Sequence, residues 1–91
     1  MMRGLFVAFE GIDGSGKSTQ ARRVAEALSA LLTFEPGDTK LGRALRQLLL
    51  HDLEVEPTSR AEALLMAADR AQHVETVIEP ALASGKNVIT D

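Results

Sequence analysis

A short apolar run, a glycine-rich loop and an amphipathic segment follow one another near the start of the chain. The apolar run spans residues 5–9, and residues 11–18 have the pattern G-x-x-x-x-G-K-S. Helix-forming residues continue from 18 to 28, with apolar side chains at intervals of three and four. A strand buried on both faces is a continuous apolar run, so the three segments predict a strand, a phosphate-binding loop and a helix.

Each residue type in this loop has a physical role in binding a polyphosphate. Glycines at 11, 14 and 16 allow positive φ angles and let backbone N–H groups approach phosphate oxygens. The helix that begins near Lys17 directs its unpaired N–H groups and the positive end of its dipole toward the same anion. Lys17 supplies a mobile cation for the β- and γ-phosphates, and the Ser18 hydroxyl can bind Mg²⁺. The motif in this context predicts binding of a nucleoside triphosphate.

Composition narrows the classes of partner. The chain has 91 residues, a net charge of −3 and no cysteine. Domains that bind nucleic acid usually carry a basic face, so this charge argues against that class. The absence of cysteine is compatible with the cytoplasm. The first apolar run is interrupted by Glu10 and is too short for a signal peptide or a membrane span. We therefore expect a cytoplasmic protein without a nucleic-acid or membrane partner.

Four further segments have regular patterns. Strands are predicted at 31–34 and 87–91, and helices at 40–50 and 59–83, the last opened by a capping box at Ser59. The order βαβααβ predicts an α/β fold with a parallel sheet. The apolar side of the longest helix is expected to consist of Leu64, Leu65, Ala68, Ala71, Val74, Ile78 and Leu82.

Carboxylates follow two of the predicted strands. Ligands bind at the carboxyl ends of strands in parallel sheets, and the glycine loop, Glu35 and Asp91 all fall at such ends. Asp91 is a candidate for the Mg²⁺ site, and the alternative is a polar residue that simply ends a strand.

Other polar residues allow more than one interpretation. Met66 and Arg70 lie one helical turn apart. Met66 can pack against the face of a planar ligand while Arg70 donates hydrogen bonds to its edge. The alternative is that Met66 packs in the core and Arg70 is a surface charge. Arg46 is a further candidate for a binding residue, with a surface charge as the alternative. His51 and His73 have no companions at metal-ligand spacing, and we interpret both as structural or solvent-exposed.

Four motifs, in order, resemble thymidylate kinases of the bacterial type. They are the loop with its flanks at 9–20, the run Glu35-Pro36-Gly37-Asp38-Thr39, the run from Leu64 to Arg70, and the run 85–91, which is similar to the approach to that family's Asp-Arg-Tyr motif. The resemblance implies a P-loop nucleoside triphosphate hydrolase-like fold, a three-layer α/β/α arrangement with a parallel sheet, in which 87–91 lies between the other two strands. Residues 1–91 would then be the N-terminal part of a single P-loop nucleoside-monophosphate kinase domain.

The resemblance also implies roles for individual residues. The reaction would transfer the γ-phosphoryl group of ATP, bound with Mg²⁺, to dTMP, giving dTDP for dTTP biosynthesis. Lys17 and Asp91 would be catalytic, and Ser18 and Asp91 would hold the metal ion. The donor nucleotide would be bound by Gly11, Ile12, Asp13, Gly14, Ser15, Gly16, Lys17, Ser18 and Thr19. The acceptor would be bound by Asp13, Glu35, Arg46, Met66 and Arg70, and a homodimer of the full-length protein is compatible with the resemblance.

Several positions depart from the family pattern. Phe34 replaces an arginine, Asp38 replaces a second glycine, and Met66 stands where a phenylalanine usually stacks on thymine. Gly14 is not basic, so the catalytic arginine would come from a lid segment that this sequence does not contain. The stretch between Ala30 and the following strand is shorter than usual and lacks a glycine, and the sequence resembles about half of the family's length.

Two alternatives to a thymidylate kinase remain open from the sequence. The first is another P-loop kinase of small molecules, which would share the loop but not the helix from Leu64 to Arg70. The second is a non-catalytic nucleotide-binding module. A regulatory GTPase is disfavoured, because no recognisable switch segment precedes the strand that ends at Asp91.

Overall fold

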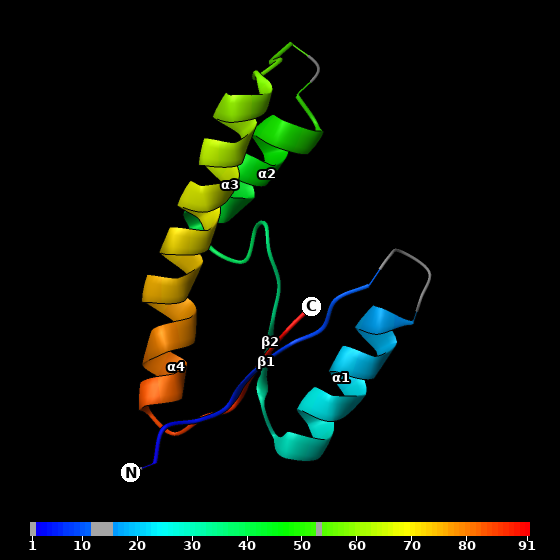
Figure 1. Cartoon of the computed structure of the whole chain (residues 1–91), viewed down its shortest axis with the longest axis vertical. Helices are drawn as coiled ribbons and strands as arrows, with labels where there is room; N and C mark the ends of the chain where they lie inside the picture. Colours follow the sequence, from blue (N-terminus) through cyan, green and yellow to red (C-terminus); the bar gives the residue numbers. More distant parts are fainter. Residues whose placement is uncertain (1, 12–15, 53) are drawn as a thin grey trace. The chain divides into compact units, whose positions relative to one another are not determined.

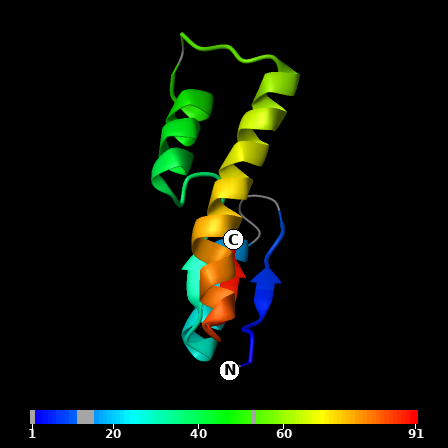
Figure 2. The same ribbon diagram turned by 90° about the vertical axis from the view of Figure 1, so that its left-hand side faces the viewer.

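The computed structural model describes residues 2–11, 16–52 and 54–91, which form two compact units (Figures 1 and 2). The first unit is Met1–Phe34 with Ile78–Asp91, and the second is Glu35–Val77. The first contains β1 (Phe6–Ala8), α1 (Lys17–Leu28), β2 (Leu31–Thr33), α4 (Glu79–Ala83) and β3 (Val88–Thr90). The second contains α2 (Lys40–Leu50) and α3 (Ser59–His73).

The first unit is built on a parallel sheet in the order β1-β3-β2. Ile89 in the centre of β3 pairs in register with Val7 of β1 and with Leu32 of β2. The sheet lies between α1 and α4 (Figures 1 and 2), and both Val88 and Ile89 are fully buried. Flanking by two strands and two helices explains why β3 is apolar on both faces. The predicted α/β class, the parallel sheet and the central position of 87–91 are confirmed.

Helix α1 packs closely on the sheet because its buried residues are small. Ala21 and Ala25 lie one turn apart, and both are buried in one cluster with Ile89. Val7 and Phe9 pack against the edge of this cluster. Small side chains at these positions let the helix approach the strands. The start of α1 lies beside the carboxyl end of β3, where Lys17 pairs with Asp91.

The connection from α1 to β2 consists of two residues. Ser29 has a φ of 50° in the left-handed region, and its N–H group bonds back to the last turn of α1. The N–H group of Ala30 donates to the Ala25 carbonyl at 2.8 Å. This is the usual way for a helix to end, with serine where glycine is favoured. The sequence gives no glycine signal here, and a non-glycine residue in the left-handed conformation makes the turn instead.

The predicted helix 59–83 has the expected bounds, Ser59 and Ala83, but contains a π-helical turn. Its N-cap is Thr58, whose hydroxyl accepts from the Ala61 N–H at 3.2 Å, so the capping box expected at Ser59 is wrong by one residue. After α3 the chain forms a single π-helical turn, Val74–Ile78, and α4 follows with Pro80 in its first turn. Proline has no N–H group to bond the carbonyl four residues earlier, which prevents a continuous α-helix at this point.

In the second unit, α2 packs against α3. The side chains of Leu45, Leu48 and Leu49 in α2 are half-buried, whereas Leu41 in its first turn is 44% exposed.

The predicted apolar side of the helix 59–83 is confirmed at Ile78 and Leu82, which are buried. It is wrong within α3, because Leu64 is 66% exposed whereas Asp69 and His73 are each 1% exposed. Polar side chains occupy the buried face because they hold the loop that precedes α2.

Candidate functional site

The start of α1, in the first unit, directly follows the predicted glycine loop. Gly16 has a φ of 85°, and α1 begins at the next residue, Lys17. Within the described residues no side chain caps this helix, so its first N–H groups point away from the helix without a side-chain acceptor. Gly11, Lys17, Ser18 and Thr19 belong to the described part of the predicted loop. The predicted contributions of Ile12, Asp13, Gly14 and Ser15 lie outside the described residues.

Asp91 lies where the three strands end. Its N–H group donates to the Thr33 carbonyl at 3.0 Å, and the Phe9 N–H donates to the Thr90 carbonyl at 2.9 Å. The carboxyl ends of β1 and β2 are thereby tied to the end of β3. The Asp91 backbone therefore lies at the carboxyl edge of the sheet, and its side chain extends from this edge.

The Asp91 carboxylate meets the first turn of α1. Lys17 Nζ lies 3.4 Å from Asp91 Oδ1, and the Ser18 hydroxyl hydrogen-bonds the same carboxylate. The hydrogen bond with Ser18 lowers the pKa of Asp91 most, burial raises it, and Lys17 lowers it again, so the pKa lies below its usual value of 3.8. The predicted association of Lys17, Ser18 and Asp91 is thus present in one corner of the first unit.

This corner has the donor chemistry that Mg²⁺ prefers. Asp91 Oδ1 is buried and, apart from its ion pair with Lys17, has no hydrogen-bond partner among the described residues; the Ser18 hydroxyl adds a second hard oxygen. No three His, Cys, Asp or Glu side chains of the described residues gather into a site. Mg²⁺ is typically held by one or two protein oxygens together with substrate phosphates and water, so the residues fit that ion.

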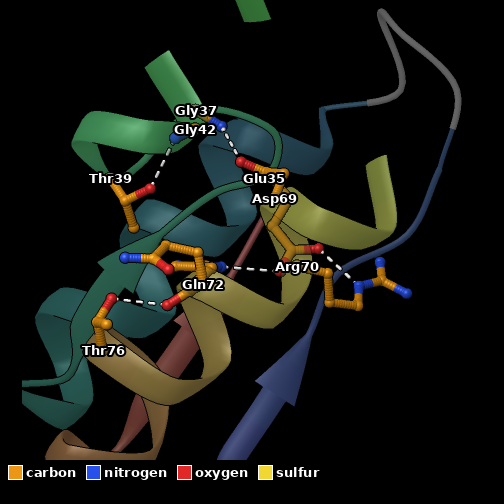
Figure 3. Close-up of polar contacts among 9 residues, drawn as sticks. Glu35, Gly37, Thr39, Gly42, Asp69, Arg70, Gln72 and Thr76 are labelled. Carbon is orange, nitrogen blue, oxygen red and sulfur yellow. Dashed lines mark hydrogen bonds and ion pairs between the residues drawn. The ribbon is translucent and has the colours of Figure 1, made fainter. Parts of the chain in front are cut away.

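A second polar centre, in the second unit, is built around Glu35 (Figure 3). Arg70 Nε donates to Glu35 Oε1 at 2.8 Å, and His73 Nδ1 lies 2.8 Å from Glu35 Oε2. Burial raises the pKa of Glu35, but the hydrogen bonds from His73 and Arg70 lower it by more, so it lies below its usual value of 4.5. The bond with Glu35 raises the pKa of Arg70. Glu35 is therefore an ionised carboxylate with a partner on each oxygen.

Asp69 holds the backbone of the loop that carries Glu35. Asp69 Oδ1 accepts from the Gly37 N–H at 3.0 Å, and the carboxylate is 1% exposed (Figure 3). A Cβ atom at Gly42 would overlap this carboxylate and would lie 3.1 Å from Gly37 Cα. Arg46 Nη1 donates to the Pro36 carbonyl at 2.9 Å. Side chains of α2 and α3 thus both hydrogen-bond the backbone of the segment 35–37.

The predicted acceptor residues are partly brought together. Glu35 and Arg70 are in direct contact, and Arg46 contacts the same loop through Pro36. Met66 lies one turn before Arg70 on α3 and is 40% exposed. Phe34, at a position where the resemblance expects arginine, is 42% exposed.

Sequence reasoning missed Asp69 and left His73 without a role. His73 is buried and hydrogen-bonded, so the structural half of its interpretation is confirmed, whereas His51 is exposed. The signal was the spacing, because Asp69 and His73 are four residues apart and therefore share one helix face. Two polar residues on one face of a helix, among apolar residues, indicate hydrogen-bond partners in another segment of the chain.

Comparisons with known proteins identify the family. The thymidylate kinase family model matches residues 9–91. The chain is 55% identical over 98 positions to the thymidylate kinase of Bifidobacterium longum (strain NCC 2705), covering 99% of this chain and 48% of that protein. It is 49% identical to the probable thymidylate kinase of Pyrococcus horikoshii, with coverages of 99% and 48%. A crystal structure of thymidylate kinase from Ehrlichia chaffeensis matches with a TM-score of 0.86 and 41% identity, over 98% of this chain and 53% of that one.

The chain is shorter than the relatives that it matches. The chain spans about half the length of the curated relatives it matches. The match to the Bifidobacterium longum protein extends over 98 positions, whereas this chain has 91 residues, so at least seven positions of that relative lack a counterpart here. That the shortening falls between Ala30 and Leu31 stays a prediction. The family model over residues 9–91, together with relatives about half identical over 99% of the chain, shows that this protein belongs to the thymidylate kinase family.

Proposed function

We propose that the protein that carries this sequence transfers the γ-phosphoryl group of ATP to dTMP, giving dTDP. The observation that carries the proposal is the meeting of Lys17, Ser18 and Asp91 at the start of α1, on the carboxyl edge of a parallel sheet. Membership of the thymidylate kinase family supports the choice of acceptor. We also propose that the two compact units belong to one P-loop nucleoside-monophosphate kinase domain.

On the donor side, the residues act by position and charge. Lys17 and the first N–H groups of α1 would neutralise the phosphates and hold them in line for transfer. Ser18 and Asp91 would hold Mg²⁺, with the low pKa of Asp91 keeping the carboxylate ionised. The bound ion supplies charge neutralisation of the phosphate oxygens. Asp13 is proposed to bind the acceptor sugar, and the remaining loop residues the donor phosphates.

On the acceptor side, Arg70 has an exposed guanidinium group. Its Nε is used by Glu35, and its side chain is 74% exposed, which leaves the terminal guanidinium nitrogens to donate to a base carbonyl. Met66, one turn away, would cover the face of the ring with a polarizable thioether. Arg46 is proposed to serve the acceptor phosphate, and Glu35 to shape the pocket.

Location and assembly are proposed more coarsely. We propose a cytoplasmic protein that forms a homodimer at full length, without nucleic-acid or membrane partners. The helices among residues 2–11, 16–52 and 54–91 are all too short or too polar to cross a membrane.

The test is phosphoryl transfer by the protein that carries this sequence, measured by ³¹P NMR with ATP, Mg²⁺ and a panel of dTMP, dUMP, dCMP and dAMP. We expect dTDP from dTMP as the main product, and loss of turnover in Lys17→Ala. Lys86→Ala, at an exposed lysine of the same unit, is the matched control and should behave as wild type. Preferential transfer to another nucleotide would favour a different small-molecule kinase, and ATP binding without transfer would favour a non-catalytic module.

A further inference from the structure

We propose that His73 is a positioning residue, which fixes the Glu35 carboxylate and through it the guanidinium of Arg70. The inference rests on the proposed function, because it assigns His73 an effect on acceptor binding and not on ATP. Sequence and family motifs direct attention to Glu35 and Arg70, whereas the structure adds the buried group behind them.

The three side chains form a path from the interior of the second unit to its surface. The His73 side chain is 1% exposed, that of Glu35 is 17% exposed and that of Arg70 is 74% exposed. The two joining contacts are both 2.8 Å. The histidine is therefore the buried end of the path and the guanidinium its solvent-exposed end (Figure 3 shows Glu35 and Arg70).

The chemistry of the contacts sets their direction. An ionised carboxylate only accepts hydrogen bonds, so His73 Nδ1 carries a proton and donates to Oε2. Oε1 is then the oxygen that faces Arg70 Nε. Holding one oxygen fixes the plane of the carboxylate, and that plane fixes the guanidinium in turn, because guanidinium and carboxylate groups pair in preferred planar geometries.

The effect on Arg70 is separable from the support of the loop backbone. Asp69 holds the Gly37 N–H and Arg46 holds the Pro36 carbonyl, so the main chain around Glu35 has anchors of its own. Loss of the His73 donor should leave the loop in place and free the Glu35 side chain. An exposed arginine samples many rotamers, and a free Glu35 would no longer select one of them.

The experiment compares His73→Leu with His73→Asn in the protein that carries this sequence. Leucine fills the space without a donor, whereas the asparagine amide nitrogen can take the place of Nδ1. We expect His73→Leu to raise the KM for dTMP about 10-fold, with the KM for ATP changed less than about twofold, and His73→Asn to restore most of the loss. His51→Asn, at the exposed histidine, is the control.

A measurement that does not depend on activity reports on the contact itself. The Arg70 Nε–H proton, observed by ¹H–¹⁵N NMR, should show a hydrogen-bonded shift and slow exchange in wild type and in His73→Asn. In His73→Leu it should shift upfield and exchange faster. If dTMP is not a substrate, the proposed function fails while this resonance still decides the role of His73.

A double variant tests whether His73 acts through Glu35. In His73→Leu/Glu35→Gln, the KM for dTMP should match the more impaired single variant within about twofold. Multiplying effects would overturn the proposal, as would an unchanged Arg70 Nε–H resonance in His73→Leu. Equal loss of dTMP binding in the leucine and asparagine variants, with the resonance lost in both, would also overturn it, because packing alone would then explain the result.

Discussion

The two units of the chain carry their polar centres in different ways. In the first, Gly16, Lys17 and Ser18 are consecutive, and Asp91 contacts Lys17 and Ser18 because a parallel strand ends beside the start of α1. In the second, the Glu35 carboxylate contacts the side chains of Arg70 and His73, which lie 35 and 38 residues away in sequence. The geometry of the first centre is set by the backbone of a helix start and a strand end, whereas that of the second is set by hydrogen bonds between side chains. Substitutions should therefore affect the two centres differently.

The largest expected effect is at the centre built on backbone form. Asp91→Asn removes the charge that pairs with Lys17 while leaving the strand backbone unchanged. We expect kcat/KM to fall about 100-fold, equivalent to about 2.7 kcal/mol, with a higher Mg²⁺ concentration needed for half-maximal rate. The measurement is steady-state kinetics over a Mg²⁺ titration. A fall of less than about threefold, at unchanged Mg²⁺ dependence, would mean that Asp91 only ends the strand.

A packing change should disrupt the second unit and spare the first. The methyl group of Gly42→Ala would overlap Asp69 and separate it from the Gly37 N–H. We expect the free energy of unfolding to fall by about 2–3 kcal/mol, because overpacking is added to the loss of a buried hydrogen bond. Denaturant unfolding of the variant measures this.

The control for this change is Gln47→Ala, at an exposed position of α2, which should be neutral within about 0.5 kcal/mol. Wild-type stability and an unchanged KM for dTMP in Gly42→Ala would show that the loop does not need its anchor on Asp69.

The network around Glu35 should also respond to pH. Its pKa is lowered in the folded state, so its contribution is present above the unfolded value near 4.5 and is lost as pH falls through the folded value. At pH 7, Glu35→Gln should be less stable than wild type by about 1–2 kcal/mol. Unfolding curves at pH 7, 4.5 and 3 should show this difference shrinking toward acid pH. A difference that stays constant or grows below pH 4.5 would contradict the ionised, doubly bonded carboxylate.

The smallest expected effect concerns the turn between α1 and β2. Ser29 has a φ of 50°, so Ser29→Gly should raise the free energy of unfolding by about 0.5 kcal/mol. Ser84 ends α4 with a φ of −79°, and Ser84→Gly should lower it instead. Thermal unfolding of the two variants gives the comparison, and the same sign of change in both would show that the left-handed conformation at Ser29 is not the determining feature.

The sequence predicts well what depends on local pattern. The apolar runs give three strands, and helical spacing gives α2 with the bounds Lys40–Leu50. It fails where a neighbouring residue competes for the same role, as with Thr58 and Ser59 at the N-cap of α3. The π-helical turn before Pro80 depends on how the chain accommodates a missing N–H group, and no residue pattern specifies that outcome.

The candidate site divides in the same way. The association of Lys17 and Ser18 with Asp91 is predictable, because parallel strands place their carboxyl ends together. The burial of Asp69 and His73 is not, since it depends on which loop lies against α3 once the chain is folded. Their four-residue spacing shows that they share a face but does not name Gly37 and Glu35 as the partners.

We propose that residues of the second unit bind the acceptor, whereas the start of α1 binds the donor. Arg70→Ala separates these two roles, with initial rates measured over a matrix of ATP and dTMP concentrations and with Arg70→Lys measured beside it. We predict that the KM for dTMP rises roughly 30-fold, about 2 kcal/mol, while the KM for ATP stays within about twofold. Arg70→Lys should recover little, because an ammonium lacks the Nε that Glu35 binds. Unchanged use of dTMP by Arg70→Ala, or an equal rise in both KM values, would show that Arg70 does not bind the acceptor.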